Sequence, residues 1–348
     1  MHSLPIRSGR SEKRPSRVLR FFALLSLGLA SAPLAAFADT LPAARIAEFS
    51  GDRAGAISYT FDDNIRDQYT LAVPMMNEFG LKGTFFVIAG RTAETPEEGE
   101  QKANDPNIRK QWGGISWPEL KIMFDQGHEI ASHTWSHRNM AKISPEDAEA
   151  ELSKAYEAIK TRIGQAPLTL AFPFNASSPE VKDMALKYHV NFRSYQVGAS
   201  GKTTVDSLKK WADNAASEKK WAVLMLHGIA RGYASLSDPE ILREHFKYVK
   251  SREKDLWVDT FANISRYRKE HENAEIKLEG SNGNITCTLT SSLDPQIYNF
   301  PLTLVIETKG ARAVSAKRDG KPLPAEIRNG ALFIEASPDP KPITVLWK

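Results

Sequence analysis

The alternation of apolar strand-forming runs with amphipathic helices, which recurs between residues 56 and 271, most constrains what this chain can fold into. The first unit has an apolar run at 56–61, helical apolar spacing over 69–79 and a second apolar run at 83–88. A strand, a helix and another strand at this spacing indicate parallel pairing, because parallel neighbours need a crossover connection. The chain is therefore predicted to build an α/β domain around a parallel sheet.

The same unit repeats along the chain, and polar residues gather where the strands end. Strands are predicted at 128–131, 168–172, 190–195 and 221–228, helices from Ser116 and over 144–163, 178–189, 205–217 and 238–254, and a closing strand and helix at 256–271. Such units describe a (β/α) barrel of the triosephosphate-isomerase kind, distorted or incomplete. Residues 91–111, with two prolines and several acids, are predicted to be an irregular surface insertion.

The pattern changes near Glu272, after which alternating runs replace the helical spacing. Asn-Gly and Asp-Gly pairs separate these runs, as hairpin turns require. We predict an α/β domain over 44–271 and a small β-sandwich over 275–348, which suits a chain too long for one core. The aromatic residues of the predicted β-sandwich fit either a packing role, which we favour, or a glycan-binding surface. These residues are Tyr298, Phe300, Phe333 and Trp347.

Residues 1–38 have the pattern of a secretory signal peptide. Basic residues precede an apolar stretch at 21–29, and small residues follow up to Ala38. The alternative, a membrane anchor, is disfavoured because the apolar stretch is too short to span a bilayer. Cleavage near Ala38 would export a mature chain without a transmembrane segment. That chain would contain 40 basic and 41 acidic residues, so nothing in its charge points to a nucleic-acid partner.

Two adjacent carboxylates, Asp62 and Asp63, follow the first predicted strand directly. Neighbouring negative charges repel unless a cation or proton intervenes, so the pair indicates a metal site. His133 and His137 could supply further ligands, because their four-residue spacing would place both imidazoles on one helical face. Two histidines and one carboxylate leave coordination positions open for water and substrate.

The histidine at the end of the strand 221–228, His227, supports the same site. Strand ends of a parallel barrel converge on one mouth, so His227 should lie near the two carboxylates. His128 is expected to be a structural hydrogen-bonding residue. His189, His245 and His271 lie in helical, charged surroundings and are expected to be exposed.

The chain resembles the polysaccharide deacetylases, carbohydrate esterase family four with its NodB-type homology domain. Four motifs in chain order carry the resemblance: Thr60-Phe61-Asp62-Asp63, His133-Thr134-Trp135-Ser136-His137, Phe172-Pro173-Phe174 and Leu224-Met225-Leu226-His227. The first two are specific when found together, and the others support them. The resemblance covers about residues 50–265, leaves out the C-terminal part, and implies a distorted barrel of the polysaccharide deacetylase type.

The resemblance also implies roles for individual residues. Asp62 would be the general base and His227 the general acid. A divalent ion, with zinc favoured, would be held by the metal ligands Asp63, His133 and His137. The backbone N–H of Phe174 would help to bind the oxyanion, and Met225 would line the pocket for the acetyl methyl group.

This sequence departs from the family pattern in two places. Ala171 stands where the third motif usually opens with an arginine that orients the base. Arg193, near the end of a neighbouring strand, is our candidate replacement, although a surface salt bridge would equally explain it. The acidic partner of the acid histidine is also hard to place. Asp213 is the nearest candidate, although it lies in a helical pattern, where simple solvation is the alternative.

These residues suit the hydrolysis of an acetyl amide or ester, so we expect a metal-dependent hydrolase that removes N- or O-linked acetyl groups from an extracytoplasmic polysaccharide or oligosaccharide. One alternative is a catalytically weakened glycan-binding protein on the same fold, motivated by Ala171 and the β-rich domain. Another is a hydrolase of small cyclic amides, which would have a closed pocket instead of an open groove.

Overall fold

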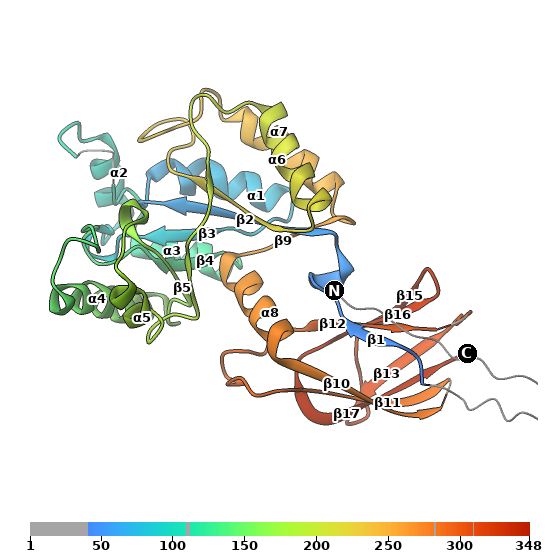
Figure 1. Ribbon diagram of the computed structural model, residues 1–348. Coiled ribbons are helices and arrows are strands. Elements are labelled where there is room, and N and C mark those ends of the chain that lie inside the picture. The colour runs from blue at the N-terminus through green and yellow to red at the C-terminus, as the bar shows by residue number, and fades with distance from the viewer. Residues whose placement is uncertain (1–40, 109–111, 282, 309) are drawn as a thin grey trace, which may run out of the picture. The chain divides into compact units, whose positions relative to one another are not determined.

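The computed structural model of the protein describes residues 41–108, 112–281, 283–308 and 310–348 (Figure 1). The predicted signal peptide, residues 1–38, lies outside the described residues, so export stays a prediction. The described residues belong to one unit, Asp39–Lys348. No helix in the described ranges is long and apolar enough to cross a membrane.

The central strand β2, Gly55–Asp62, is buried along its whole length, as its continuous apolar run predicts. It belongs to an eight-stranded sheet with the order β6-β5-β4-β3-β2-β8-β7, in which β9 pairs with the start of β2. Every strand pair in this sheet is parallel. The other strands are β3 Thr84–Val87, β4 Glu129–Ser132, β5 Thr169–Ala171, β6 Asn191–Arg193, β7 Val197–Gly198, β8 Trp221–Leu226 and β9 Leu256–Val258.

The sheet is curled but not closed. Within the described residues, no pairing joins the outer strands β6 and β7. The prediction of an incomplete (β/α) barrel is therefore confirmed, and the carboxyl ends of β2, β4 and β8 face the same mouth.

Helices connect the strands and begin and end at local sequence signals. The helix α4, Pro145–Ile163, follows Ser144, whose side chain accepts a hydrogen bond from the N–H of Asp147. It ends at Gly164, whose φ of 86° suits a residue without a Cβ. The remaining helices are α1 Val73–Glu78, α2 Pro96–Asn104, α3 Trp117–Asp125, α5 Pro179–Ala185, α6 Val205–Ser217, α7 Glu240–Ser251 and α8 Phe261–Asn273.

The segment predicted to be an irregular insertion, residues 91–111, contains the helix α2, so that prediction was wrong in part. The side chain of Thr95 caps this helix by accepting from the N–H of Glu98 at 3.2 Å. Pro96 occupies the first turn, where its missing N–H costs nothing. The proline and acids that suggested a loop are here signals of a helix start.

Aromatic side chains fix β2 in the core. Phe61 stacks on Phe85 of β3 with ring centroids 4.7 Å apart, and Tyr59 meets Phe246 of α7 edge-on at 4.9 Å. All four side chains are at most 1% exposed. Because burying such a side chain contributes about 1.5–3 kcal/mol, the residues that follow β2 start from a well-fixed position.

The C-terminal residues form two antiparallel sheets, with the orders β10-β11-β17-β13-β14 and β1-β12-β16-β15. Both contribute to one buried apolar cluster, to which Cys287, Leu304 and Val345 belong, so the predicted small β-sandwich is confirmed. The strands are β10 Ala274–Ser281, β11 Asn284–Ser291, β12 Leu302–Glu307, β13 Val314–Arg318, β14 Lys321–Pro322, β15 Ala325–Arg328, β16 Ala331–Ala336 and β17 Asp339–Trp347.

One strand of the β region comes from the start of the described chain. The strand β1, Ala44–Ile46, pairs with β12, and Ala44 lies opposite Ile306. The sequence analysis predicted no strand before residue 56, because the three residues of β1 are too few to show an alternating pattern. The domain boundary predicted between 271 and 275 stays a prediction.

Candidate active site

The side chains predicted to carry the chemistry meet in one hollow of about 300 Å³ at the carboxyl ends of the parallel strands. Asp62 ends β2, His133 follows β4, and His227 follows β8. The lining residues are Asp62, Asp63, His133, His137, Phe172, Phe174, Asn175, Arg193, Met225, His227 and Tyr233. Of the predicted site residues, only Asp213 lies elsewhere.

Asp63, His133 and His137 place three possible ligand atoms within 4.8 Å of one another. Oδ1 of Asp63 lies 3.5 Å from Nε2 of His133 and 3.3 Å from Nε2 of His137. This oxygen is buried and has no hydrogen-bond partner among the described residues. Two imidazole nitrogens and an otherwise unpaired carboxylate oxygen are a donor set that fits one divalent ion.

His133 is held in the neutral form that a metal ligand would need. Its Nδ1 lies 2.6 Å from the carbonyl oxygen of Ala171, to which it donates, so the lone pair is left on Nε2. Burial lowers the pKa of His133 to about 4, even though the carboxylates of Asp62 and Asp63 oppose that shift. Its imidazole is therefore uncharged at neutral pH, as metal binding requires.

The two histidines do not share a helix, so this part of the prediction was wrong. Residues 133–139 form a loop after β4, and both Thr134 and His137 have positive φ, 66° and 65°. A four-residue spacing cannot by itself separate a helical face from a tight loop. The sequence analysis also missed Glu151 of α4, whose carboxylate holds the loop by accepting from the N–H of Ser136 at 2.8 Å and from its hydroxyl.

Arg193 contacts the predicted base directly. Its guanidinium donates to Oδ1 of Asp62 at 2.8 Å and to Oδ2 at 2.5 Å, and both side chains are buried. Arg193 lies beside Ala171 in the register of β5 and β6. The arginine missing at Ala171 is thus replaced from the next strand, and the alternative of a surface salt bridge is wrong.

The charge of Arg193 governs the ionisation of Asp62. Burial raises the pKa of this carboxyl, but the charge and hydrogen bonds of Arg193 outweigh it, with smaller effects from His133 and His227, and lower the pKa to about 2. Asp62 is therefore ionised at neutral pH.

His227 lies beside Asp63, and its predicted acidic partner, Asp213, lies elsewhere. Nε2 of His227 is 3.8 Å from Oδ2 of Asp63, and the imidazole is 14% exposed. Asp213 of α6 instead accepts a hydrogen bond from Tyr248 at 2.6 Å and pairs with Arg252. The prediction for Asp213 was wrong because its helical position faces α7 and not the mouth of the sheet.

Two residues that the sequence analysis missed connect the ends of β2 and β8. The amide of Gln68, which begins the short helix η2, Gln68–Ala72, donates to the carbonyl oxygens of Asp62 at 2.6 Å and His227 at 2.9 Å. Oδ2 of Asp67 accepts three consecutive backbone N–H groups, those of residues 229–231, at 2.7 to 3.0 Å. Their only sequence signal is two polar residues shortly after the paired acids.

Phe174 and Met225 both line the hollow, as predicted. Phe174 has a positive φ of 59°, and its ring lies 4.8 Å from that of His137 and is 58% exposed. The roles predicted for its N–H and for Met225 stay predictions.

Residues 50–192 match the family model described as polysaccharide deacetylase. Residues 50–192 of the chain belong to the polysaccharide deacetylase family. The match includes the paired acids, the histidine loop and the third motif, and ends before His227.

Relatives of this polysaccharide deacetylase family member are matched over only part of their length. A gellan lyase from a Bacillus species is 24% identical over 352 residues, 87% of this chain and 13% of that protein. A chitin deacetylase from Arthroderma benhamiae is 32% identical over 139 residues, 39% of this chain and 33% of that protein. A solved structure of a mutant of the peptidoglycan deacetylase PdaC from Bacillus subtilis has a TM-score of 0.46 at 18% identity, over 63% of this chain and 93% of that chain.

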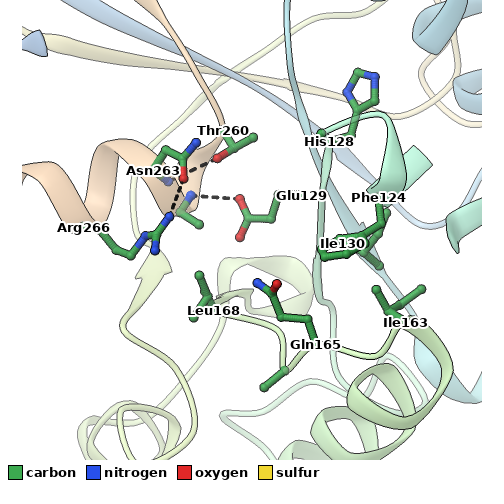
Figure 2. A pocket seen from close by; sticks show the side chains of 13 residues that line it. Phe124, His128, Glu129, Ile130, Ile163, Gln165, Leu168, Thr260, Asn263 and Arg266 are labelled. Atoms are coloured by element: carbon green, nitrogen blue, oxygen red, sulfur yellow. Dashed lines mark hydrogen bonds between the residues drawn. The ribbon is translucent and has the colours of Figure 1, made fainter. Parts of the chain in front are cut away.

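A second hollow of the α/β region, about 210 Å³, lies near the start of β4 and is not a candidate for the chemistry (Figure 2). Its partly buried acid, Glu129, accepts hydrogen bonds from Thr84, Thr169 and the N–H of Ala262 at the start of α8. With both oxygens occupied, this carboxylate connects the strands to α8 and has a structural role.

Of the other histidines in the part of the chain that the structure describes, His128, His189 and His245 are buried and His271 is half-buried. His128 accepts from the N–H of Gly83, as its predicted structural role requires. His189 and His245 are 4% and 0% exposed, so the expectation that they lie on the surface was wrong. A neutral imidazole can pack on the apolar side of an amphipathic element. Burial lowers the pKa of both His189 and His245, which favours the neutral form.

Proposed function

We propose that this protein is a metal-dependent hydrolase that removes acetyl groups from an extracytoplasmic polysaccharide or oligosaccharide. One observation carries the proposal: Asp62, Asp63, His133, His137 and His227 line a single hollow, although up to 165 positions separate them in the chain. Two carboxylates and three imidazoles in this arrangement supply a metal site, a base and an acid.

Asp63, His133 and His137 would hold the metal, and zinc suits a donor set of two nitrogens and one oxygen. When bound, such an ion polarises the acetyl carbonyl and lowers the pKa of the attacking water. The buried Oδ1 of Asp63, which faces both Nε2 atoms, supports this assignment.

Asp62 would take the proton from the attacking water. Its low pKa keeps it ionised, and the two hydrogen bonds from Arg193 fix the orientation of the carboxylate. A carboxylate of such low pKa is a weak base in water, so it depends on a strongly acidified water molecule.

His227, on the other side of Asp63, would donate a proton to the departing sugar amine or hydroxyl. An amine leaves poorly unless it is protonated, so this role matters most for N-acetyl substrates. The N–H of Phe174 would bind the developing oxyanion, and Met225 would contact the acetyl methyl group.

The N-terminal sequence pattern supports an extracytoplasmic substrate. Among the relatives, the chitin deacetylase suggests N-acetylated chito-oligosaccharides as a first substrate. Peptidoglycan, poly-N-acetylglucosamine and acetylated xylan complete a test panel that separates amide from ester hydrolysis.

Acetate release from this panel tests the proposal. The wild-type protein loaded with zinc should release acetate from at least one substrate, and removal of the metal by a chelator should abolish the release until zinc is returned. Asp62→Asn preserves size and metal ligands but removes the base, so it should bind zinc and lose activity. Wild-type protein that binds no divalent ion, or that releases acetate equally well without one, would contradict the proposal.

The competing function is a catalytically weakened glycan-binding protein. This alternative was suggested by Ala171, which stands in place of an arginine. The argument is weaker because Arg193 pairs with Asp62 from the neighbouring strand. Glycan binding by metal-loaded protein without acetate release from any substrate of the panel would favour this alternative.

A further inference from the structure

Two residues that no predicted role uses, Trp112 and Gly113, hold the candidate metal ligand Asp63 from outside the hollow. The indole Nε1–H of Trp112 donates to Oδ2 of Asp63 at 2.8 Å. The backbone N–H of Gly113 donates to the carbonyl oxygen of the same aspartate at 3.2 Å. One dipeptide, 49 positions along the chain, thus contacts both the side chain and the backbone of Asp63.

Asp63 needs such support because its backbone is strained. Its φ is 78°, in a region that residues with a Cβ avoid unless surrounding contacts enforce it. Its own N–H donates to Phe86 of β3 at 3.2 Å, and Gly113 holds the carbonyl at the other end of the residue. Gly113 itself has a φ of 76°, and a Cβ there would collide with the carbonyl oxygen of Arg91.

The indole of Trp112 also contacts a second candidate ligand. Its ring centroid lies 4.5 Å from that of His137, and the guanidinium of Arg91 lies 5.1 Å from the ring. Trp112 does not line the hollow itself. Its N–H therefore contacts Asp63, and its ring contacts His137, from outside the hollow.

We propose that Trp112 and Gly113 are positioning residues for the metal site. The Trp112 N–H occupies Oδ2 of Asp63, which leaves Oδ1 as the oxygen that faces His133 and His137. Gly113 keeps the strained backbone of Asp63 in place. This inference rests on the proposed function, since it assigns an outer support to the same metal ligands.

Metal affinity of Trp112→Phe tests the inference. Phenylalanine retains an aromatic ring between His137 and Arg91 but cannot donate to Asp63. Purified full-length protein, stripped of metal, is titrated with Zn²⁺ in competition with a chromophoric chelator. The dissociation constant of the variant should rise about tenfold or more relative to wild type, as is typical when a partner of a metal ligand is removed.

Trp221→Phe is the matched control. The indole N–H of Trp221 donates to Ser58 at 3.1 Å, so the control also loses one indole hydrogen bond, but at the opposite end of β8. Its zinc affinity should equal that of wild type. Thermal unfolding of the metal-free proteins should show Trp112→Phe no less stable than the control, which separates a loss of metal affinity from a loss of folding.

Three results would overturn the inference: a Trp112→Phe variant that binds zinc as tightly as wild type, equal weakening in both variants, or a raised KM with unchanged zinc affinity, which would make Trp112 a substrate contact. Wild-type protein that binds no zinc would instead refute the proposed function, on which this inference depends.

Discussion

Arg193 shows how a single side chain can restore a contact from a different position in the chain. It reaches Asp62 from β6, one strand away from Ala171, and its guanidinium also donates to Thr60 and lies 5.0 Å from the ring of Phe86. A guanidinium presents two parallel donors to a carboxylate, whereas an ammonium presents a point charge. The orientation of Asp62 should therefore depend on the arginine and not on positive charge alone.

Arg193→Lys should retain the charge but lose the paired hydrogen bonds. We expect kcat for acetate release to fall about 10–100-fold, because small misplacements of a catalytic group carry costs of this size. Since Arg193 lowers the pKa of Asp62, the acidic limb of the pH–rate profile should also move to higher pH. An unchanged kcat with an unmoved acidic limb would show that Asp62 is not oriented by Arg193.

At the scale of elements, the mouth of the barrel is assembled from loops that are each fixed by a second element. Glu151 of α4 holds the histidine loop, and Gln68 of η2 connects the strand ends that carry Asp62 and His227. Asp67 holds the turn after His227 through three N–H groups on one oxygen. The carboxylate of Asp67 and the N–H of Ile229 are both buried, so no water can replace Asp67 at that N–H.

Asp67→Ala should leave three backbone N–H groups without their acceptor: the buried N–H of Ile229 and the partly buried ones of Ala230 and Arg231. Each unsatisfied buried group costs about 1–3 kcal/mol, so the turn should shift and kcat should fall at least about tenfold, while zinc affinity stays unchanged. Asp67→Asn keeps one acceptor oxygen and should have an intermediate kcat.

Asp213→Asn is the matched control for this pair, because Asp213 is an acid that lies on α6 away from the mouth. It should leave kcat unchanged. If Asp213→Asn lowered kcat while Asp67→Ala did not, the assignment of Asp67 to the His227 turn would be refuted.

At the scale of the whole molecule, the helix α8 has contacts with both the parallel sheet and the β region. Its first turn donates to Glu129, and Tyr267 donates to the carbonyl oxygen of Ala47 at 2.7 Å. Near its end, Glu270 is fully buried and accepts from the N–H of Phe300 at 2.9 Å through Oε1, while Oε2 has no hydrogen-bond partner in the described ranges. Burial raises the pKa of Glu270 to about 7, although the Phe300 N–H and the nearby Arg266 oppose this.

The Glu270 carboxyl should make folding stability depend on pH. An acid whose pKa is raised in the folded state costs stability when ionised, so this cost is absent well below pH 4.5 and complete above about pH 7. Glu270→Gln cannot ionise and should be more stable than wild type by ~1–3 kcal/mol at pH 8. Denaturant unfolding of both proteins at pH 5 and pH 8 measures this difference, and a difference that is the same at both pH values would contradict the assignment.

Local signals in the sequence predicted much of the fold. The buried run of β2, the capped start of α4 and the alternation after residue 275 all depend on neighbours within one element, so they can be read along the chain. The paired acids and the histidine pair also predicted that Asp63, His133 and His137 lie together, because the carboxyl ends of parallel strands must converge. The same convergence brought His227 to the mouth.

Only the tertiary structure decided which distant residues support that site. Arg193 reaches Asp62 because β5 and β6 pair in one register, and Trp112 reaches Asp63 because the segment after α2 returns to the mouth. Asp213 was excluded in the same way, since its helix faces α7. Contacts between residues 49 to 165 positions apart leave no periodic pattern in the sequence. Which of several chemically similar side chains lies at the site therefore depends on how the elements pack.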